Sequence, residues 1–464
     1  MAEPYLGDLC DITLRPDPIV KYGKPRRPWI ETSSVLPAWS LVSPAASRAV
    51  GGLRRSEAAC GIDGPLFSPE TFSMKASRIV VLLHELSLTG APRLTLDALE
   101  TIGADASLRI VTMEGGPLLH LARRLGPTAV LWQAGLGRAL PRQLATESVV
   151  RVLAGGFSRI RAIERGARTR RWNPDLVYVS SVAALPLVSM LRLADIPVVL
   201  HVHELGSALT SFERAHPGLV RSVPDQYVAV SAAVVSDLVQ LGVPLGAISV
   251  VPPYVFPPTP MVLPATARGD EATLIVGGAG NPSWTKGMDL WLLAAREAVD
   301  RLGLDRLRFV WVGYRDNAAG RQFRAMISKL DLDSAVELVP ETDRPYDQFA
   351  RFDMFAMASW EESASLVVLE TMAMGVPVIC FAPTGGPAEE VGGAGIVIPE
   401  ISPSRMADAI VDLAESPQKR RTMGSACADR AREQYRRDTS LAALTKVFDV
   451  AVTSHRRLCE PPWV

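Results

Sequence analysis

Short apolar runs recur along most of this chain, and stretches with helical periodicity separate them. In the first half the expected strands are residues 78–83, 109–113, 128–132, 176–179, 197–202, 227–230 and 248–251. In the second half they are residues 273–278, 308–313, 336–339, 354–357, 377–381 and 396–398. Strands that alternate with helices in this way favour parallel sheets with helices packed on them. The sequence therefore predicts an α/β protein with two Rossmann-like domains.

Prolines mark the expected boundaries. They interrupt residues 1–76, where no apolar period is sustained, so we expect an irregular or disordered extension, of which residues 1–73 are dispensable. A second run of prolines, Pro252–Pro260, predicts a stiff hinge. Apolar residues spaced three and four apart between Leu441 and Ala451 predict a last helix. The expected segments are residues 1–76 (extension), 77–255 (first domain), 256–270 (linker), 271–435 (second domain) and 436–464 (final helix).

Composition excludes several classes of protein. The chain has 49 basic and 49 acidic residues, a balance that gives no support to a nucleic-acid partner. Five scattered cysteines without a C-x-x-C pair suggest neither a zinc site nor a disulfide framework. The chain lacks a signal peptide and a run of about eighteen uncharged apolar residues, so we expect a cytoplasmic protein. Six arginines between residues 159 and 171 fit a solvated helix face or a basic helix at the inner face of the membrane.

The most informative local pattern is a strand followed by a polar elbow and a helix. The elbow is expected at Ser359–Ser365 and the helix at residues 366–374, with Ser363 or Ser365 as the N-cap. Gly375 fits the position that ends a helix. Free N–H groups and the helix dipole at such a helix start attract anions. The pattern therefore predicts a site for a diphosphate.

Two glutamates accompany this helix start. Glu370 lies five residues into the helix, about 7–8 Å along its axis. That distance is the step from the phosphates of a nucleotide to its ribose, and a carboxylate accepts both hydrogens of a vicinal diol. Glu362 lies in the elbow, where its charge repels phosphate and suits the hydroxyls of a group beyond the phosphates. The two side chains therefore predict contacts on either side of a diphosphate.

The spacing Glu362-x7-Glu370 resembles the E-x7-E motif of retaining glycosyltransferase family 4, also called glycosyl transferases group 1. The flanking residues resemble that donor-site block as well, with Ser-Trp-Glu-Glu before the helix and Leu-Val-Val-Leu-Glu-Thr-Met-Ala-Met-Gly-Val-Pro-Val-Ile through it. The resemblance implies the GT-B fold, in which two Rossmann-like domains face each other across a cleft and a final helix returns to the first domain. It also implies a sugar nucleotide donor that is bound without a metal or another cofactor.

The glycine-rich stretch after the first strand of the second half carries a second resemblance. Lys286 matches the lysine of a basic pair that holds the diphosphate in the family, and Asn281 stands where the arginine of that pair is usual. One cation instead of two then faces the diphosphate. A P-loop needs Gly-Lys-Ser/Thr, which Lys286-Gly287 does not give, and a dinucleotide fingerprint needs a third glycine that follows Gly278-Ala279-Gly280 at the right spacing.

Other positions also resemble the family's site. Gly90 belongs to a Thr-Gly-Ala loop where the family has Gly-Gly-Ala beside the donor phosphate. His203 ends a strand, where ligands bind in α/β sheets, and matches a histidine near the transferred sugar. Gly385, Gly386 and Glu389 match a Gly-Gly-x-x-Glu turn beside the donor. Each has a structural alternative, namely a simple βα turn, a hydrogen-bonded histidine and ordinary turn chemistry.

These residues define the candidate site. The catalytic candidates are Glu362, His203 and Lys286, and the donor-binding candidates are Glu370, Lys286, Asn281, Ser363, Ala364, Ser365, Leu366, Gly90, Gly385, Gly386 and Glu389. No metal ligand is expected.

The resemblance implies transfer of a hexose, with retained configuration, from a nucleoside diphosphate sugar to an acceptor hydroxyl. The acceptor would be a glycan or a lipid-linked molecule in polysaccharide or glycolipid synthesis, and contact with the membrane surface stays open. Two alternatives remain: a catalytically inactive scaffold that binds a sugar nucleotide, and a nucleotide-sugar epimerase of the same fold. Paired carboxylates also suit a glycosidase, but a hydrolase needs no diphosphate site and no cationic lysine.

Overall fold

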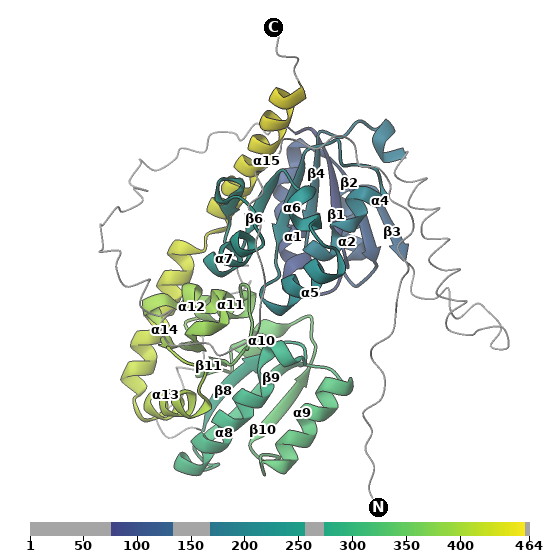
Figure 1. The fold of residues 1–464 in the computed structure, drawn as a ribbon. Coiled ribbons are helices and arrows are strands. Elements are labelled where there is room, and N and C mark those ends of the chain that lie inside the picture. Colours follow the sequence, from purple (N-terminus) through teal and green to yellow (C-terminus); the bar gives the residue numbers. More distant parts are fainter. Residues whose placement is uncertain (1–75, 133–167, 256–272, 460–464) are drawn as a thin grey trace, which may run out of the picture. The chain divides into compact units, whose positions relative to one another are not determined.

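Two parallel β-sheets carry the fold in this computed structural model, which describes residues 76–132, 168–255 and 273–459. The described residues belong to one compact unit. The prediction of an α/β protein with two Rossmann-like sheets is confirmed (Figure 1). The expected extension up to residue 75, the linker 256–270 and most of the arginine-rich stretch lie outside the described residues.

The first sheet has seven strands in the order β3-β2-β1-β4-β5-β6-β7. Every neighbouring pair is parallel. The strands are β1 (Arg78–Leu83), β2 (Ser107–Glu114), β3 (Thr128–Trp132), β4 (Leu176–Ser180), β5 (Val198–Val202), β6 (Gln226–Ala229) and β7 (Ile248–Val250). Its helices are α1 (Gly90–Ile102), α2 (Leu119–Leu125), α4 (Pro186–Met190), α5 (Ser207–Ala215), α6 (Leu219–Ser222) and α7 (Ala232–Gln240).

The second sheet has six strands in the order β10-β9-β8-β11-β12-β13, again all parallel. The strands are β8 (Leu274–Ala279), β9 (Leu307–Tyr314), β10 (Val336–Pro340), β11 (Met354–Met357), β12 (Val378–Phe381) and β13 (Ile396–Ile398). Its helices are α8 (Met288–Leu302), α9 (Ala318–Lys329), α10 (Pro345–Phe349), α11 (Leu366–Ala373), α12 (Gly386–Val391), α13 (Pro403–Glu415) and α14 (Pro417–Gln434).

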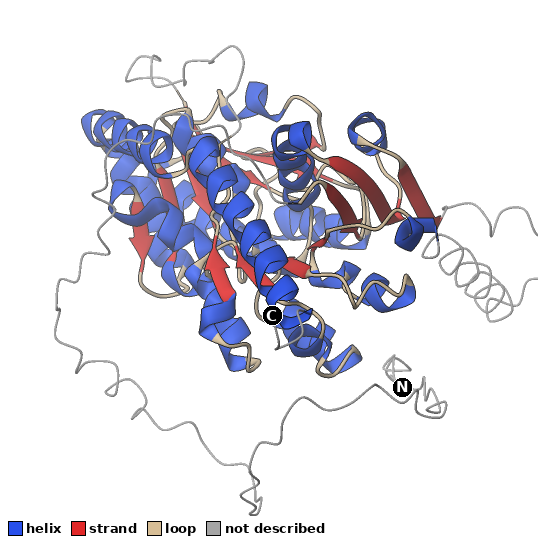
Figure 2. Ribbon diagram, turned by 90° about the horizontal axis from the view of Figure 1, so that it is seen from above, coloured by secondary structure: helices blue, strands red, loops and turns tan. Residues whose placement is uncertain are grey.

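Both faces of each sheet are covered by helices, which are blue around the red strands in Figure 2. Successive strand residues point to opposite faces, and the core follows this rule. In β1, Ile79 and Val81 pack in a cluster with α1 and α2, whereas Val80 and Leu82 pack in a cluster with α4 and α7. Such two-sided burial explains why the strands are nearly continuous apolar runs in the sequence.

The observed strands begin and end within two residues of the predicted ones. Helix α1 differs, because it begins at Gly90, inside the Thr-Gly-Ala stretch that was expected to be a loop. Pro92 lies in its first turn, where a residue without an N–H group is tolerated because that group has no intrahelical acceptor. Thr89 precedes the helix with an extended backbone and makes no side-chain cap. The loop after β1 is therefore shorter than the sequence suggested.

The strand order reverses at one place in each sheet, between β1 and β4 and between β8 and β11. In open α/β sheets a ligand binds outside the carboxyl ends of the strands at such a reversal. The loops that leave β1, β8 and β11 are the ones in which the sequence placed its main candidates. The topology therefore points to these three loops.

The last helix, α15 (Arg437–Cys459), packs on the first sheet. Its apolar stripe from Leu441 to Ala451 shares a core cluster with β1 and α1. The ring of Phe448, which is fully buried, lies edge-on to Tyr178 with 5.0 Å between centroids. Arg437, the first residue of this helix, binds Asp97 of α1 at 2.7 Å. Tyr254, which follows β7 in the chain, binds the same carboxylate at 2.6 Å. The helix is thus held by apolar packing and by a charged anchor.

We expect Phe448→Ala to lower the free energy of unfolding by about 3–5 kcal/mol, because it removes a buried aromatic ring and leaves a cavity. Val450→Ala is the matched control, since Val450 is on the same helix and 41% exposed. The measurement is urea denaturation of the full chain. Equal losses in the two variants would contradict the packing of α15 described here.

Candidate active site

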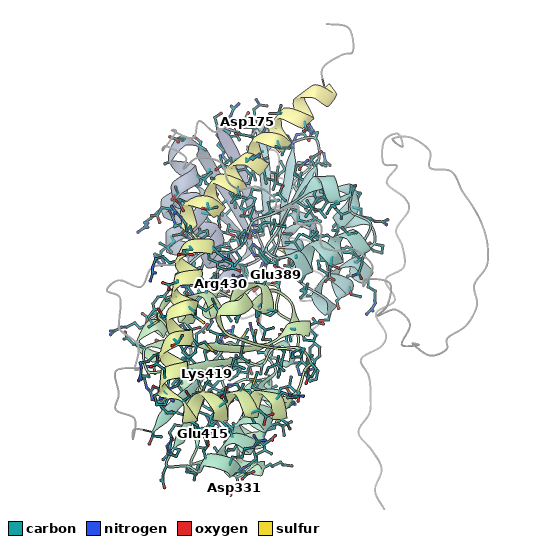
Figure 3. All side chains as sticks on the ribbon, turned by 90° about the vertical axis from the view of Figure 1, so that its left-hand side faces the viewer. Asp175, Asp331, Glu389, Glu415, Lys419 and Arg430 are labelled. Carbon is teal, nitrogen blue, oxygen red and sulfur yellow. The ribbon has the colours of Figure 1, made fainter. Side chains whose placement is uncertain are left out.

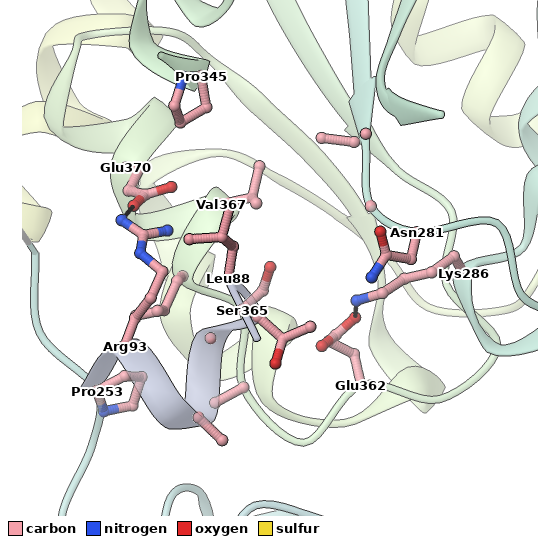
Figure 4. A pocket seen from close by; sticks show the side chains of 18 of the residues that line it. Leu88, Arg93, Pro253, Asn281, Lys286, Pro345, Glu362, Ser365, Val367 and Glu370 are labelled. Carbon is pink, nitrogen blue, oxygen red and sulfur yellow. Dashed lines mark hydrogen bonds and ion pairs between the residues drawn. The ribbon is translucent and has the colours of Figure 1, made fainter. Parts of the chain in front are cut away.

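A pocket of about 400 Å³ lies where the loops after β1, β8 and β11 meet (Figure 4). Its size is in the range of small-molecule sites. The candidates that line it are Gly90, His203, Asn281, Lys286, Glu362, Ser363, Ala364, Ser365, Leu366 and Glu370. The structure therefore brings together residues from both halves of the sequence. Gly385, Gly386 and Glu389 do not line this pocket.

Helix α11 points its first turn at the pocket. Ser365 caps it, because its Oγ accepts a hydrogen bond from the N–H of Val368 at 3.3 Å. Ser363, the other expected cap, instead donates its hydroxyl to the carbonyl of His203 at 2.6 Å. The N–H groups of Leu366 and Val367 open the helix, where no intrahelical acceptor exists. Both residues line the pocket, so this helix start suits an anion.

A second helix start meets the first. Gly90 begins α1, and a Cβ atom added there would lie 3.3 Å from the Cδ1 of Leu366. Gly90 and Ala91 line the same pocket. The positive ends of two helix dipoles therefore converge on one space, which strengthens the attraction for a negatively charged ligand.

A buried carboxylate marks one end of the pocket. Glu370 is 1% exposed, and its Oε1 accepts hydrogen bonds from Arg93 at 3.1 Å and from the hydroxyl of Tyr346 at 2.9 Å. Burial raises the pKa of Glu370, while the Arg93 guanidinium opposes this rise. Both contacts are made at Oε1, and Oε2 accepts no hydrogen bond from the described residues. This oxygen is available for a hydroxyl group of a ligand.

An ion pair lies at the opposite end. Lys286 ends a short 3-10 turn after β8, and its Nζ is 2.5 Å from Oε2 of Glu362. Ser359 donates a hydrogen bond to the same oxygen at 3.3 Å. Asn281 lies beside Lys286 in Figure 4. The backbone of Gly287, which follows, has φ +58° and approaches Ala358 so closely that no Cβ atom fits. The lysine is therefore fixed against the elbow.

His203 lines the pocket from the first sheet. Its ring stacks on His201 with 4.1 Å between centroids, as expected for alternate residues on one strand face. Burial and the neighbouring His84 lower the pKa of His203 to about 3. His201 donates to or accepts from the Tyr178 hydroxyl at 2.6 Å, and burial lowers its pKa as well. His203, which faces the pocket, and His201 beside it are therefore neutral at pH 7.

The Gly385–Glu389 turn lies outside the pocket lining and contacts the elbow and α7. Gly385 pairs with Glu362 as an isolated bridge and has φ +118°, with no room for a Cβ atom beside the Glu362 carbonyl. The carboxylate of Glu389 accepts N–H groups from the first turn of α7, at 3.1 Å and 3.3 Å. The main-chain carbonyl of Glu389 accepts a hydrogen bond from Arg430 at 2.8 Å. Figure 3 labels both residues. The turn positions the elbow and binds a helix of the first sheet.

Some functional candidates were not predicted from the sequence. Arg93 and Tyr346 bind Glu370 although they lie far from it in the chain. Glu390 is 2% exposed and accepts the N–H of Ser365 at 2.7 Å, so it holds the start of α11. Burial raises the pKa of Glu390 well above its usual value. Arg93 had one usable signal, namely its place in the first turn of a helix that begins at a candidate loop.

In the described segments, no group of three His, Cys, Asp or Glu side chains is arranged to hold a metal ion. None of the helices in these segments has the length and apolar character needed to cross a membrane.

Family models match both halves of the chain. The model described as Glycosyltransferase Family 4 matches residues 116–256, and the model described as Glycosyl transferases group 1 matches residues 271–416. Among curated proteins, the D-inositol 3-phosphate glycosyltransferase of Kineococcus radiotolerans is 28% identical over 273 residues, 51% of this chain and 62% of that protein. The Streptomyces scabiei enzyme of the same name is 35% identical over 112 residues, 24% of this chain and 25% of that protein.

Solved structures resemble the whole architecture. Anabaena HepE in complex with UDP and glucose is 18% identical with a TM-score of 0.62, covering 81% of this chain and 100% of its own. Sucrose-phosphate synthase from Thermosynechococcus elongatus is 15% identical with a TM-score of 0.63, covering 82% of this chain and 100% of its own. At such identities the likeness shows the fold alone.

The chain belongs to glycosyltransferase family 4 and has the GT-B fold, as the resemblance in the sequence predicted. The chain spans less than two thirds of the curated relatives named above, so its own donor and acceptor are matters for proposal.

We expect acid to destabilise the protein through His203. The unfolded chain takes up a proton at this residue near pH 6.5, whereas the folded chain does so only near pH 3. The unfolded state therefore binds more protons in this window, and the free energy of unfolding falls as the pH falls. Between about pH 6 and about pH 5, the free energy of unfolding should fall by about 1 kcal/mol less in His203→Asn than in the parent chain.

The measurement is urea denaturation at the two pH values. His216→Asn, which removes an exposed imidazole after α5, is the control and should behave like the parent chain. A parent-like loss in His203→Asn would show that His203 is not held neutral in the folded state.

Proposed function

We propose that this protein transfers a hexose from a nucleoside diphosphate sugar to an acceptor hydroxyl, with retention of the anomeric configuration. The observation that carries the proposal is the order of groups along one pocket. Glu370 lies at one end, the starts of α11 and α1 lie in the middle, and Lys286 with Glu362 lies at the other end (Figure 4). Ribose, diphosphate and sugar follow one another in the same order in the donor.

The donor fits this order chemically. Two ribose hydroxyls donate to Glu370, whose Oε2 accepts nothing from the described residues. The N–H groups of Leu366 and Val367 bind the diphosphate, and Lys286 neutralises part of its charge. Glu362, beyond the phosphates, accepts hydroxyls of the sugar. A diphosphate competes with Glu362 for Lys286, so donor binding frees this carboxylate for the sugar.

Bond breaking then depends on the leaving group. As the bond from the anomeric carbon to the β-phosphate breaks, charge grows on the departing diphosphate, and fixed donors at that position stabilise it. Ser359 donates a hydrogen bond to Glu362, and this contact suits the carboxylate to positioning and not to attack on the anomeric carbon. We therefore expect the acceptor hydroxyl to enter on the face from which the diphosphate leaves and to give its proton to the departing phosphate oxygen. His203, neutral at pH 7, contacts the sugar from the first sheet.

The relatives suggest the chemistry of both substrates. The HepE structure contains UDP and glucose, which supports a uridine diphosphate hexose as donor here. The curated relatives are named for the transfer of a sugar to D-inositol 3-phosphate, which supports a hydroxylated acceptor. We place acceptor choice in the first domain, and a glycan or lipid-linked acceptor in polysaccharide or glycolipid synthesis fits the family. Contact with a membrane surface is part of this proposal for a lipid-linked acceptor.

The test is to offer a panel of nucleoside diphosphate sugars with a panel of polyol and glycan acceptors, and to read the product by NMR. We expect transfer of a hexose, and an anomeric proton coupling that matches the configuration in the donor. An inverted linkage would contradict retention. Binding of the donor without turnover would favour the inactive scaffold, and isomerisation of the donor would favour the epimerase.

A further inference from the structure

The charges of the pocket are poorly matched to a diphosphate in the arrangement that the structure shows. The carboxylates that line it are Glu341, Glu362 and Glu370, and the lining cations are Arg93 and Lys286. A nucleoside diphosphate sugar brings about two further negative charges, which repel nearby carboxylates. The family's second cation is absent, because Asn281 stands in its place. A bound diphosphate therefore needs every cation that the pocket can turn towards it.

Both cations are engaged by pocket glutamates. Lys286 is 2.5 Å from Glu362, and Arg93 is 3.1 Å from Glu370. Glu370 is 1% exposed, and a carboxylate buried to this extent needs a cation or hydrogen-bond donors. Arg93 and Tyr346 meet this need where no ligand is present. A vicinal diol supplies two donors to the same carboxylate, so it can take the place of the guanidinium.

Arg93 lies within reach of the phosphate position. It belongs to the first turn of α1, whose first residue, Gly90, approaches Leu366 at the start of α11. Glu370, which Arg93 contacts at 3.1 Å, is four residues beyond Leu366, about 6 Å or one turn along the axis of α11. A guanidinium binds phosphate oxygens through two parallel hydrogen bonds, a geometry that an asparagine amide cannot offer.

We propose that Arg93 is the second diphosphate-binding cation of this protein and that it reaches the phosphates by an exchange of partners. The hydroxyls of the ribose replace Arg93 at Glu370, and the guanidinium turns to the diphosphate. This inference rests on the proposed function, because it takes the nucleoside end of the donor to lie at Glu370. It assigns to the first domain a cation that the family places in the second.

The exchange of partners and a purely positioning role of Arg93 predict different losses of binding when Arg93 is replaced. If Arg93 only orients Glu370, its loss weakens nucleoside and nucleoside diphosphate alike. If Arg93 binds the phosphates, its loss weakens the diphosphate selectively, and a cation placed at position 281 compensates. Arg93→Gln keeps hydrogen-bond donors near Glu370 and removes the charge, whereas Arg93→Lys keeps a charge.

The experiment is isothermal titration of the full chain with the best-bound of UDP, GDP and ADP, and with the matching nucleoside. Thermal melting of each variant checks that it folds. Lys286→Ala serves as the reference for loss of a phosphate cation. We expect Arg93→Gln to weaken diphosphate binding at least tenfold and nucleoside binding less than threefold. Arg93→Lys should stay within about fivefold of the parent chain, and Arg93→Gln combined with Asn281→Arg should recover most of the lost affinity.

Three outcomes count against the inference. Equal losses for nucleoside and diphosphate in Arg93→Gln would assign Arg93 to positioning alone. Absence of rescue by Asn281→Arg, with the variant folded, would show that the missing charge is not at the phosphates. Either result leaves the proposed function standing. Failure of the parent chain to bind any nucleoside diphosphate would overturn the proposed function and this inference together.

Discussion

A carboxylate buried in a protein must keep a cation or hydrogen-bond donors beside it, and Glu370 meets this requirement with a residue 277 positions away in the chain. Arg93 on α1 supplies the cation, and Tyr346 on α10 supplies a hydroxyl. The contact fixes α1 against α11, so that the two helix starts converge on one pocket. The proposed anion site and the proposed hydroxyl site are therefore both positioned by the same ion pair.

Other carboxylates of the second sheet domain bind helix starts of the first. Glu361 accepts the N–H of Ser207 at 3.0 Å, and Glu389 accepts that of Ala232 at 3.1 Å. A negative side chain at a helix N-terminus is worth about 0.3–1 kcal/mol, so these contacts are weak enough to break and re-form. Glu361 immediately precedes Glu362, and Glu389 lies three residues after Gly386. The elbow that we propose binds the donor therefore also joins the two domains, which would give donor binding a way to influence domain contact.

The strands and the start of α11 could be predicted from local sequence. The strands were visible because burial on both faces selects continuous apolar runs. The cap could be narrowed to Ser363 or Ser365, because a serine just before a helix can accept an N–H group of its first turn, and the structure shows that it is Ser365. Long-range pairs were not predictable. Nothing near Arg93 points to Glu370, and Asp97 gives no sign that Tyr254 and Arg437 bind it. A single sequence carries no record of such pairs, because each side chain alone fits a solvated helix face.

The account turns on where a nucleoside diphosphate lies in the pocket, and a crystal structure of the protein with that ligand measures this directly. We expect the ribose hydroxyls within hydrogen-bond distance of Glu370, and the diphosphate at the N–H groups of Leu366 and Val367 with Lys286 and Arg93 beside it. A ligand bound elsewhere, or bound here with the ion pair between Arg93 and Glu370 unchanged and no hydroxyl at Glu370, would contradict the account.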